Sequence, residues 1–338
     1  MLAARLRAIG QPLELVELPV PEPRGTELRI RVAACGVCRT DLHILFGSQP
    51  RVTPPLTLGH EVAGWIDAFG PDASRSLPLG EPVAVFGGWG CGSCRECRGG
   101  NEQRCALGAS PGFQRDGGYA EFMLVPDARH LVRLGSLDPV RAAPLADAGV
   151  TPFRAVRRAL AWLTPRARVL LIGFGALGQF AIQYLPPGCV VAVRDLDPRK
   201  VERARSMGAV TALDGPADVV FDFVGTSETL ASAAVAVAPG GLISLVGEGA
   251  GTLPFSFDSP AVEASVTTTA WGSLDDLRSV VDAAAQLRWE VETMPLSQAA
   301  AALDRLAAGD VSGRLVLVPG VELSRPGGET GSPSDAGA

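Results

Sequence analysis

Hydrophobic positions follow two different patterns along the chain. Over about the first 150 residues, short β-branched runs are interrupted by Gly and Pro, which is typical of strands in a mostly β domain. These runs are Glu27–Ala33, His60–Ile66, Pro82–Phe86 and Ala120–Val125. From about Thr151 onward, strand-like and helix-like segments alternate, which predicts a parallel, doubly wound sheet. The chain is therefore expected to be an α/β protein of two domains.

The second pattern predicts individual elements. The expected strands are Arg168–Ile172, Val190–Val193, Val219–Phe223 and Leu242–Val246, and the expected helices are Ala176–Leu185 and Pro198–Met207. After Arg288, we expect the segment Glu290–Pro295, a helix over Leu296–Ala308 and a strand over Gly313–Val318 to return to the first domain. Residues Gly320–Ala338 are rich in Gly, Ser, Pro and acids, so we predict a disordered tail.

Composition indicates an ordinary soluble protein. The chain has 338 residues, 47% of them hydrophobic, and a net charge of -6, so it offers no basic surface for nucleic acid. The longest apolar stretch, Val169–Leu185, contains three glycines and two glutamines, which favours a strand, turn and helix over a membrane span. Residues Met1–Pro21 resemble neither a secretory signal nor a transit helix, so we expect a cytoplasmic location.

Four of the seven cysteines lie close together at Cys91, Cys94, Cys97 and Cys105, in a glycine-rich segment spanning 88–106. Four thiolates at this spacing are typical of a structural zinc site, where one ion replaces a hydrophobic core. The alternatives are two disulfides or four unrelated thiols, but the spacing is regular and no secretory segment is present. We therefore predict a zinc-binding lobe.

A second motif predicts a dinucleotide site. Gly173, Gly175 and Gly178, with Ala176 and Leu177 between them, follow an apolar strand and open a helix. Glycines in this context allow a tight turn and close approach of a pyrophosphate to the helix N-terminus. The alternative is that they only pack a helix on a sheet.

The nucleotide specificity is predicted from the residues after the second strand. Asp195 lies 22 residues after Gly173, where a carboxylate can accept the ribose hydroxyls, which favours NAD. Arg194, Arg199 and Lys200 nearby leave room for NADP.

Two of the three histidines accompany a cysteine in the first domain. Cys38, Thr40, Asp41 and His43 form one cluster, and His60 with Glu61 follows about 20 residues later. A hydride-transfer enzyme without a second organic cofactor needs a Lewis acid, and zinc suits Cys and His ligands. Taken singly, Cys38 and His60 would each be read as ordinary core residues.

These motifs together resemble the zinc-dependent medium-chain alcohol dehydrogenases, through about Pro319. The resemblance extends to Pro144–Thr151 and to Phe221–Gly225, and Thr267–Gly272 is similar to a bacterial secondary-alcohol dehydrogenase subgroup. It implies a GroES-like catalytic domain over 1–151 and 288–319, which includes the zinc lobe. It also implies a Rossmann domain over 152–287, and the tail predicted from composition occupies 320–338.

The resemblance assigns a second, catalytic zinc to Cys38, His60 and Asp147. Many relatives have a cysteine in place of Asp147, and the secondary-alcohol subgroup has aspartate. Further roles are implied near this zinc: Glu61 lies beside the metal, Asp41 orients His60, and Thr40 and His43 relay the alcohol proton.

The resemblance also implies cofactor and substrate contacts. It places Thr151 near the nicotinamide and Arg314 at the pyrophosphate. The sequence around Arg314 fits an exposed arginine at a strand edge equally well. Lys200 and Val246 are further predicted cofactor contacts. The aromatic residues Phe46, Trp89 and Trp271 either line an apolar substrate cleft or pack in the core.

Three residues match no position in the implied site. His130 is expected to be structural or solvated. Cys35 and Cys189 fit no ligand position, and a redox pair of Cys35 with Cys38 is the minor alternative.

We therefore expect an NAD-dependent zinc enzyme with two zinc ions per chain that interconverts an alcohol and its ketone or aldehyde, favouring apolar secondary alcohols. One alternative is a zinc-free NADPH quinone reductase of the same superfamily. Another is a cofactor-binding protein without catalysis. Relatives suggest a homodimer or homotetramer.

Overall fold

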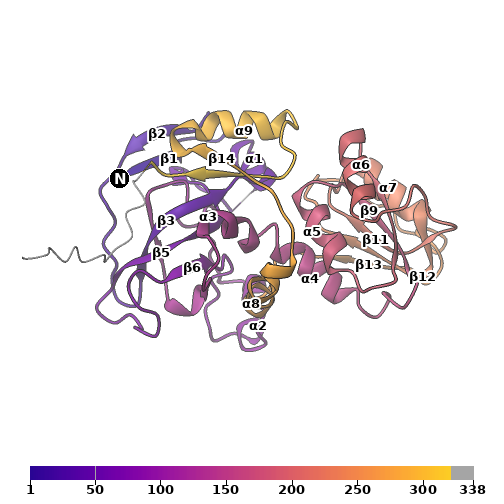
Figure 1. Ribbon diagram of the computed structural model, residues 1–338, viewed down its shortest axis with the longest axis horizontal. Coiled ribbons are helices and arrows are strands. Elements are labelled where there is room, and N and C mark those ends of the chain that lie inside the picture. The colour runs from indigo at the N-terminus through magenta and orange to yellow at the C-terminus, as the bar shows by residue number, and fades with distance from the viewer. Residues whose placement is uncertain (50, 321–338) are drawn as a thin grey trace, which may run out of the picture.

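The computed structural model describes residues 1–49 and 51–320, which form two domains joined side by side (Figure 1). The β-rich domain contains the first strands of the chain and also the last ones, β14 and β15. The parallel-sheet domain contains β9 to β13. Apart from Gly320, the predicted disordered tail lies outside the described residues. Within those residues, no helix has the length and apolar character needed to cross a membrane.

The β-rich domain is built on two sheets. Its strands are β1 (Leu2–Leu6), β2 (Glu14–Glu17), β3 (Leu28–Gly36), β4 (Leu56–Thr57), β5 (Glu61–Phe69), β6 (Pro82–Val85), β7 (Phe122–Val125), β8 (Leu131–Arg133), β14 (Val291–Pro295) and β15 (Arg314–Val318). The larger sheet has the order β14-β15-β3-β5-β6-β8, and β7 also pairs with β3. The smaller sheet has the order β2-β1-β4. Because β15 pairs with β3 in antiparallel fashion, residues near the two ends of the described chain meet in one sheet.

Short helices complete this domain and connect it to the other one. They are α1 (Arg39–Leu45), α2 (Arg95–Arg98), α3 (Pro139–Ala142), α4 (Val150–Arg158), α8 (Leu274–Ala283) and α9 (Ala299–Ala307). Single 3-10 turns lie at Glu102–Arg104, Ala128–His130, Ala143–Ala146, Ala284–Gln286 and Leu296–Gln298. The turn at Ala143–Ala146 positions Asp147, and α1 positions the residues that follow Cys38.

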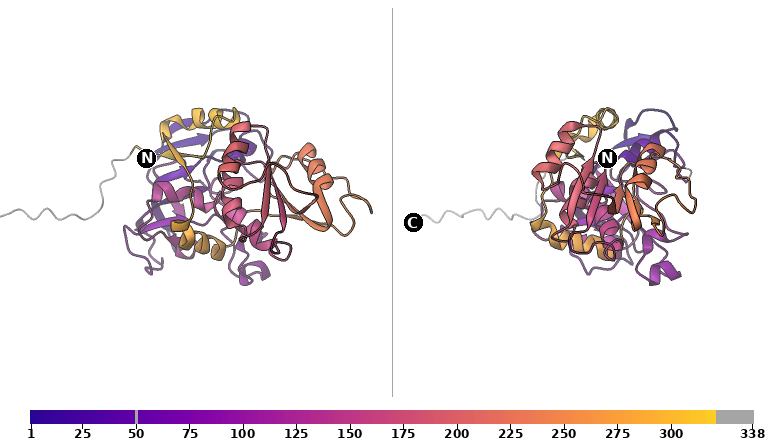
Figure 2. Two further views of the ribbon diagram at one scale, coloured as in Figure 1. Left: turned by 45° about the vertical axis from the view of Figure 1, so that its right-hand side comes forward. Right: turned by 90° about the vertical axis from the view of Figure 1, so that its right-hand side faces the viewer.

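The parallel-sheet domain has the strand order β10-β9-β11-β12-β13, with every neighbouring pair parallel. Its elements are β9 (Arg168–Ile172), α5 (Ala176–Tyr184), β10 (Val190–Arg194), α6 (Pro198–Ser206), β11 (Ala217–Asp222), α7 (Ser227–Ala236), β12 (Val237–Leu245) and β13 (Ser265–Thr268). Val169 and Leu171 pack in one hydrophobic cluster, whereas Leu170 and Ile172 pack in another. Both faces of the sheet are therefore covered, as Figure 2 also shows, and the α/β fold class is confirmed.

Helix α8 lies where the two domains meet. It falls within 152–287, the range predicted for the Rossmann domain, but Leu277, Val280 and Val281 pack in the same cluster as Val132 and Leu145 of the β-rich domain. Figure 1 shows the helix beneath that domain. The same cluster includes Phe180 of α5, so the apolar stripe of α8 packs where the two domains meet, and the predicted boundary near 288 stays a prediction.

Candidate active site

The four-cysteine lobe has the geometry of a tetrahedral metal site. Sγ of Cys94 lies 3.5 Å from that of Cys97 and 3.8 Å from that of Cys105, and the Sγ atoms of Cys91 and Cys97 are 3.9 Å apart. Zinc–sulfur bonds of about 2.3 Å give a tetrahedron with edges of about 3.8 Å, whereas a disulfide needs about 2.05 Å. The four thiols fit one zinc ion and exclude two disulfides.

A second cluster of possible metal ligands lies in the β-rich domain. Cys38 precedes α1, His60 precedes β5, and Asp147 follows the turn at Ala143–Ala146. With Glu61, their ligand atoms all lie within 4.8 Å of one another. Oδ2 of Asp147 is 3.6 Å from Sγ of Cys38 and 3.7 Å from Nε2 of His60. These separations suit one ion bound by sulfur, nitrogen and oxygen at about 2.0–2.3 Å.

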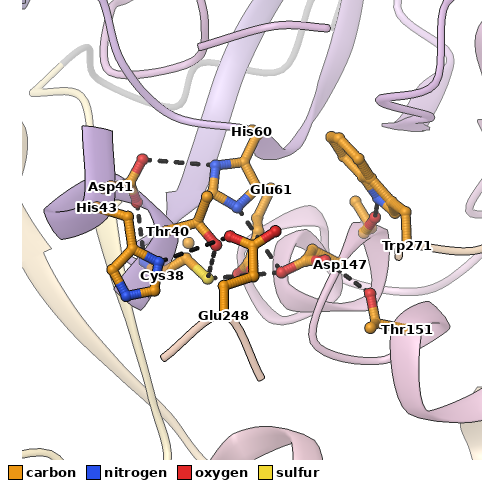
Figure 3. Close-up of polar contacts among 12 residues, drawn as sticks. Cys38, Thr40, Asp41, His43, His60, Glu61, Asp147, Thr151, Glu248 and Trp271 are labelled. Atoms are coloured by element: carbon orange, nitrogen blue, oxygen red, sulfur yellow. Dashed lines mark hydrogen bonds and ion pairs between the residues drawn. The ribbon is translucent and has the colours of Figure 1, made fainter. Parts of the chain in front are cut away.

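A buried polar chain orients the ring of His60 (Figure 3). Oδ1 of Asp41 lies 3.4 Å from Nδ1 of His60, on the side of the ring away from Asp147. Oδ2 of Asp41 accepts hydrogen bonds from the backbone N–H of Cys38 at 2.9 Å and from the hydroxyl of Tyr119 at 2.8 Å. Asp41 and Tyr119 are both fully buried. The carboxylate therefore holds His60 with Nε2 turned toward the metal cluster.

Charges in this cluster shift the pKa of its members in opposite directions. Burial alone lowers the pKa of His60, but the charge of Asp41 and hydrogen bonds from its neighbours outweigh it and raise the pKa well above its usual value. Burial alone raises the pKa of Asp147, but its contact with His60 and the charge of Arg314 lower it below the usual range. Asp147 is therefore ionised at neutral pH and suited to bind a cation.

Arg314 forms a buried ion pair with Glu61. Its Nε donates to Oε2 of Glu61 at 2.8 Å, and its guanidinium also lies 3.7 Å from Oδ2 of Asp147. Only 7% of Arg314 is exposed, so the reading of an exposed arginine at a strand edge is wrong. Burial opposes its charge, but Glu61 holds the pKa of Arg314 well above its usual value. Arg314 also lines the cleft, so its predicted contact with a pyrophosphate stays a prediction.

A cleft of about 1580 Å³ runs between the two domains. Pockets that bind drug-sized ligands have volumes of about 300–1,000 Å³, so this cleft has room for a dinucleotide and a small substrate. Among its lining residues are most of those predicted for the site: Cys38, Thr40, His43, His60, Asp147, Thr151, Gly173, Gly175, Ala176, Leu177, Gly178, Asp195, Lys200, Val246, Trp271 and Arg314. Within it, the hydroxyl of Thr151 donates to Oδ1 of Asp147 at 2.7 Å.

The glycine loop has the geometry of a phosphate-binding turn. Gly173 follows β9 with φ of +86°, a conformation that favours glycine, and a Cβ on Gly178 would come within 2.6 Å of the carbonyl oxygen of Gly173. The carboxylate of Asp195 accepts backbone N–H groups from Phe174 at 2.7 Å and from Asp197 at 2.9 Å. Asp195 is thereby fixed beside the loop at the end of β10.

The cations near Asp195 have other partners. The guanidinium of Arg199 pairs with Asp197 at 2.9 Å, and Arg194 donates to the hydroxyl of Ser232 at 2.7 Å. Lys200 lines the cleft.

The three aromatic residues predicted either to line the cleft or to pack in the core lie in three different places. Trp271 lines the cleft, its ring centroid lies 5.8 Å from that of His60, and its indole N–H donates to the carbonyl of Ala146 at 2.8 Å. Phe46 is 68% exposed and is absent from the cleft lining, because it caps the end of α1 and its ring faces outward. Trp89 is buried away from the cleft, where its indole N–H donates to the carbonyl of Phe86.

Sequence reasoning missed several residues of this region. Phe113 lies 5.5 Å from His60, measured between ring centroids, and lines the cleft. Tyr119, Gln49 and Glu248 were also missed. Of these, only Glu248 carried a local signal, because it lies between Gly247 and Gly249 in a loop that follows a predicted strand.

The remaining histidine belongs to the core beneath the zinc lobe. His130 is 1% exposed and lies between Phe86 and Trp89, so it is structural and not solvated. Burial lowers the pKa of His130 to about 3, and Arg129 adds to this effect.

Comparison with known proteins agrees with this geometry. Residues 24–136 match the alcohol dehydrogenase GroES-like domain, and residues 196–317 match the zinc-binding dehydrogenase domain. The chain is 35% identical to D-arabinose 1-dehydrogenase (NADP(+)) of Saccharolobus solfataricus, over 94% of this chain and 97% of that protein. It is 33% identical to an NAD-dependent alcohol dehydrogenase of Sulfurisphaera tokodaii, over 94% and 100% of the two chains.

A solved structure has a similar degree of sequence identity to this chain. The alcohol dehydrogenase of the archaeon Aeropyrum pernix is 32% identical and superposes with a TM-score of 0.88, covering 94% of this chain and all of that one. With two metal clusters, a glycine loop and relatives of this similarity over nearly its whole length, the chain belongs to the family of zinc-dependent medium-chain alcohol dehydrogenases.

Proposed function

We propose that the protein is an NAD-dependent alcohol dehydrogenase that interconverts apolar secondary alcohols and their ketones. One observation carries this proposal: the Cys38, His60 and Asp147 cluster and the glycine loop open into the same cleft. A bound alcohol could therefore contact both the metal and the nicotinamide. Each domain supplies one half of this arrangement.

The residues of the cluster would have distinct tasks. Zinc held by Cys38, His60 and Asp147 would supply a Lewis acid that stabilises negative charge on the substrate oxygen. The hydroxyl of Thr40 lies 3.6 Å from Sγ of Cys38, where it would receive the alcohol proton. His43 lies three residues further along α1, on the same side of the helix. Its side chain is 26% exposed, so it would pass the proton to solvent.

NAD is the cofactor that the charges favour. A 2′-phosphate would meet the carboxylate of Asp195, and Arg199, which could neutralise that phosphate, is already paired with Asp197. Relatives of similar identity carry both specificities in their names, NADP(+) in one case and NAD in the other. Asp195 decides our preference for NAD.

The aromatic side chains beside the metal cluster support an apolar substrate. Trp271 and Phe113 lie with their ring centroids 6.2 Å apart beside His60, and both line the cleft. A polyhydroxylated sugar needs several hydrogen-bonding partners, whereas two aromatic faces suit a short alkyl or aryl group. An apolar alcohol is therefore proposed, although one relative is named for D-arabinose.

The proposal is tested by NADH formation with zinc-loaded protein across a panel of primary and secondary alcohols, with NADP and D-arabinose in parallel. Oxidation of secondary alcohols with NAD is the expected result. Turnover only with NADP, or only with the sugar, would overturn the specificity, and cofactor binding without any turnover would indicate a non-catalytic role. Metal analysis distinguishes the two enzyme classes: the dehydrogenase should contain two zinc ions per chain, whereas a zinc-free quinone reductase should contain none.

We further propose that the chain forms a homodimer or homotetramer through the parallel-sheet domain. Strand β13 is the edge strand of that sheet, and Phe255 and Phe257 in the preceding loop are 71% and 87% exposed. An edge strand beside exposed aromatic residues is suited to pairing with a second copy. Light scattering after size-exclusion chromatography tests this, and a monomer at micromolar concentration would refute it.

A further inference from the structure

Glu248 is held on a rigid loop at the carboxyl end of β12. The backbone N–H groups of Val246 and Gly247 both donate to the carbonyl of Asp222, at 2.8 and 3.0 Å. A Cβ on Gly247 would come within 2.3 Å of the backbone of Val224, and one on Gly249 within 2.6 Å. The glycines on both sides of Glu248 therefore pack directly on a neighbouring loop, and the carboxylate extends from a fixed position.

This carboxylate reaches across the cleft to the β-rich domain (Figure 3). Its Oε2 accepts a hydrogen bond from Nε2 of Gln49 at 2.9 Å, a contact between residues 199 positions apart in the chain. The same oxygen lies 3.6 Å from Nδ1 of His43. Glu248, His43 and Gln49 all line the cleft.

The ring of His43 needs such a partner. Its Nδ1 is shielded from solvent and has no hydrogen-bond partner among the residues that the structure describes. The distance of 3.6 Å to Glu248 exceeds a normal hydrogen bond by only about half an ångström. A small approach of the two domains would therefore complete the bond.

The chemistry of imidazole gives this contact its significance. A neutral ring donates through one nitrogen and accepts through the other, so a partner at one nitrogen decides the state of the second. A carboxylate at Nδ1 holds the hydrogen there and leaves Nε2 as the acceptor. A proton relay requires that acceptor in one fixed place.

We propose that Glu248 is a positioning residue for His43: it accepts the Nδ1–H of the ring, fixes its tautomer and, with Gln49, ties the two domains together beside the relay. The identification of His43 as the relay rests on the proposed function, whereas the contact itself does not. Glu248 acts through His43 and need not touch the substrate.

The first test reads the tautomer of His43 directly. The chain has three histidines, so the imidazole ¹⁵N spectrum of zinc-loaded protein contains few signals, and His43→Gln assigns those of His43. We expect a protonated Nδ1 in the parent and in Glu248→Gln, whose amide oxygen still accepts, and loss of this preference in Glu248→Ala. Glu228→Ala removes another carboxylate from the cleft lining and should leave the signals in place. Unchanged His43 signals in Glu248→Ala would overturn the proposal.

The second test reads the coupling in turnover. Glu248→Ala should lower kcat about tenfold, a fraction of the 10²–10⁴ that general acid–base catalysis supplies, and Glu248→Gln should recover most of it. In the His43→Gln background, Glu248→Ala should have no further effect. An equal loss in both backgrounds would show that Glu248 acts independently of His43. A parent protein that oxidises no alcohol would refute the proposed function, while the ¹⁵N spectra would still decide this contact.

Discussion

Removing one hydroxyl, in Tyr119→Phe, should weaken the catalytic metal site without touching a ligand. The hydroxyl donates at 2.8 Å to Asp41, which in turn orients His60. Burial, followed by the charge of Asp41, raises the pKa of Tyr119 well above its usual value, so it remains a hydrogen-bond donor. A hydrogen bond to a charged group contributes about 1.5–3 kcal/mol, which corresponds to roughly 10- to 150-fold in an equilibrium constant. Substitution of a residue that hydrogen-bonds a metal-binding histidine typically lowers metal affinity by about 10–100-fold.

The chain provides a matched control in its other tyrosine. The hydroxyl of Tyr184 is buried and, within the described part of the chain, has no hydrogen-bond partner, while its ring packs on Phe180. Tyr184→Phe should therefore leave zinc affinity within twofold of the parent.

The assay is competition for zinc with a chelator of known affinity. Two phases are expected, and Cys97→Ser identifies the one that belongs to the four-cysteine lobe. Tyr119→Phe should weaken the other phase by about 10–100-fold and leave the lobe unaffected. Equal zinc affinities in the two tyrosine variants would refute the reasoning that Asp41 and its partners control the position of His60.

Three further predictions concern separate parts of the molecule. Cys38→Ser should abolish turnover and retain one zinc per chain, because the two metal clusters use separate segments; metal analysis that found none, or global unfolding by circular dichroism, would contradict this. Asp195→Ser should raise the ratio of kcat/KM for NADP over NAD by roughly tenfold or more, by removing one negative charge next to the 2′-phosphate, and an unchanged ratio would show that Asp195 does not contact the ribose. His130 has a folded-state pKa of about 3, below its unfolded value of about 6.5, so the unfolded state binds more protons between these values and stability falls as pH falls through that window. His130→Phe should therefore reduce the loss of stability between pH 6.5 and 5 by about 1.6 kcal/mol, measured by denaturant unfolding, and a variant as acid-sensitive as the parent would exclude His130 as the cause.

Local spacing explains why the four-cysteine lobe and the glycine loop could be predicted. The four cysteines lie within 15 residues, and the glycines follow directly on an apolar strand, so the sequence itself brings each set together. Four of the five strands of the parallel sheet were equally clear, because they read as apolar runs, whereas the edge strand β13 is mostly exposed and was not predicted.

Long-range contacts explain most of what was missed. Glu61 and Arg314 are 253 residues apart, and Tyr119 reaches Asp41 across 78 residues. Nothing in the neighbourhood of Tyr119 or Arg314 indicates such a partner. Only the sheet that joins β15 to β3 brings Arg314 to the metal cluster.

Side-chain direction explains the remaining errors. Phe46 is close to His43 in sequence, but the end of α1 turns its ring to solvent.

Strand β3 continues to Gly36, beyond the predicted end at Ala33, because pairing with β5 and β15 extends it through small residues that carry no strand signal of their own.

The late position of β15 in the chain has a consequence for biosynthesis. Arg314 leaves the ribosome only after the entire parallel-sheet domain, whereas Glu61 leaves it near the beginning. Until then, a folding β-rich domain would have to bury Glu61 without its positive partner, and an uncompensated buried charge costs about 3–5 kcal/mol. A nascent chain that stalls before residue 314 therefore carries all the predicted zinc ligands but lacks Arg314, the cation that neutralises Glu61 beside them, and this ion pair forms among the last steps of synthesis.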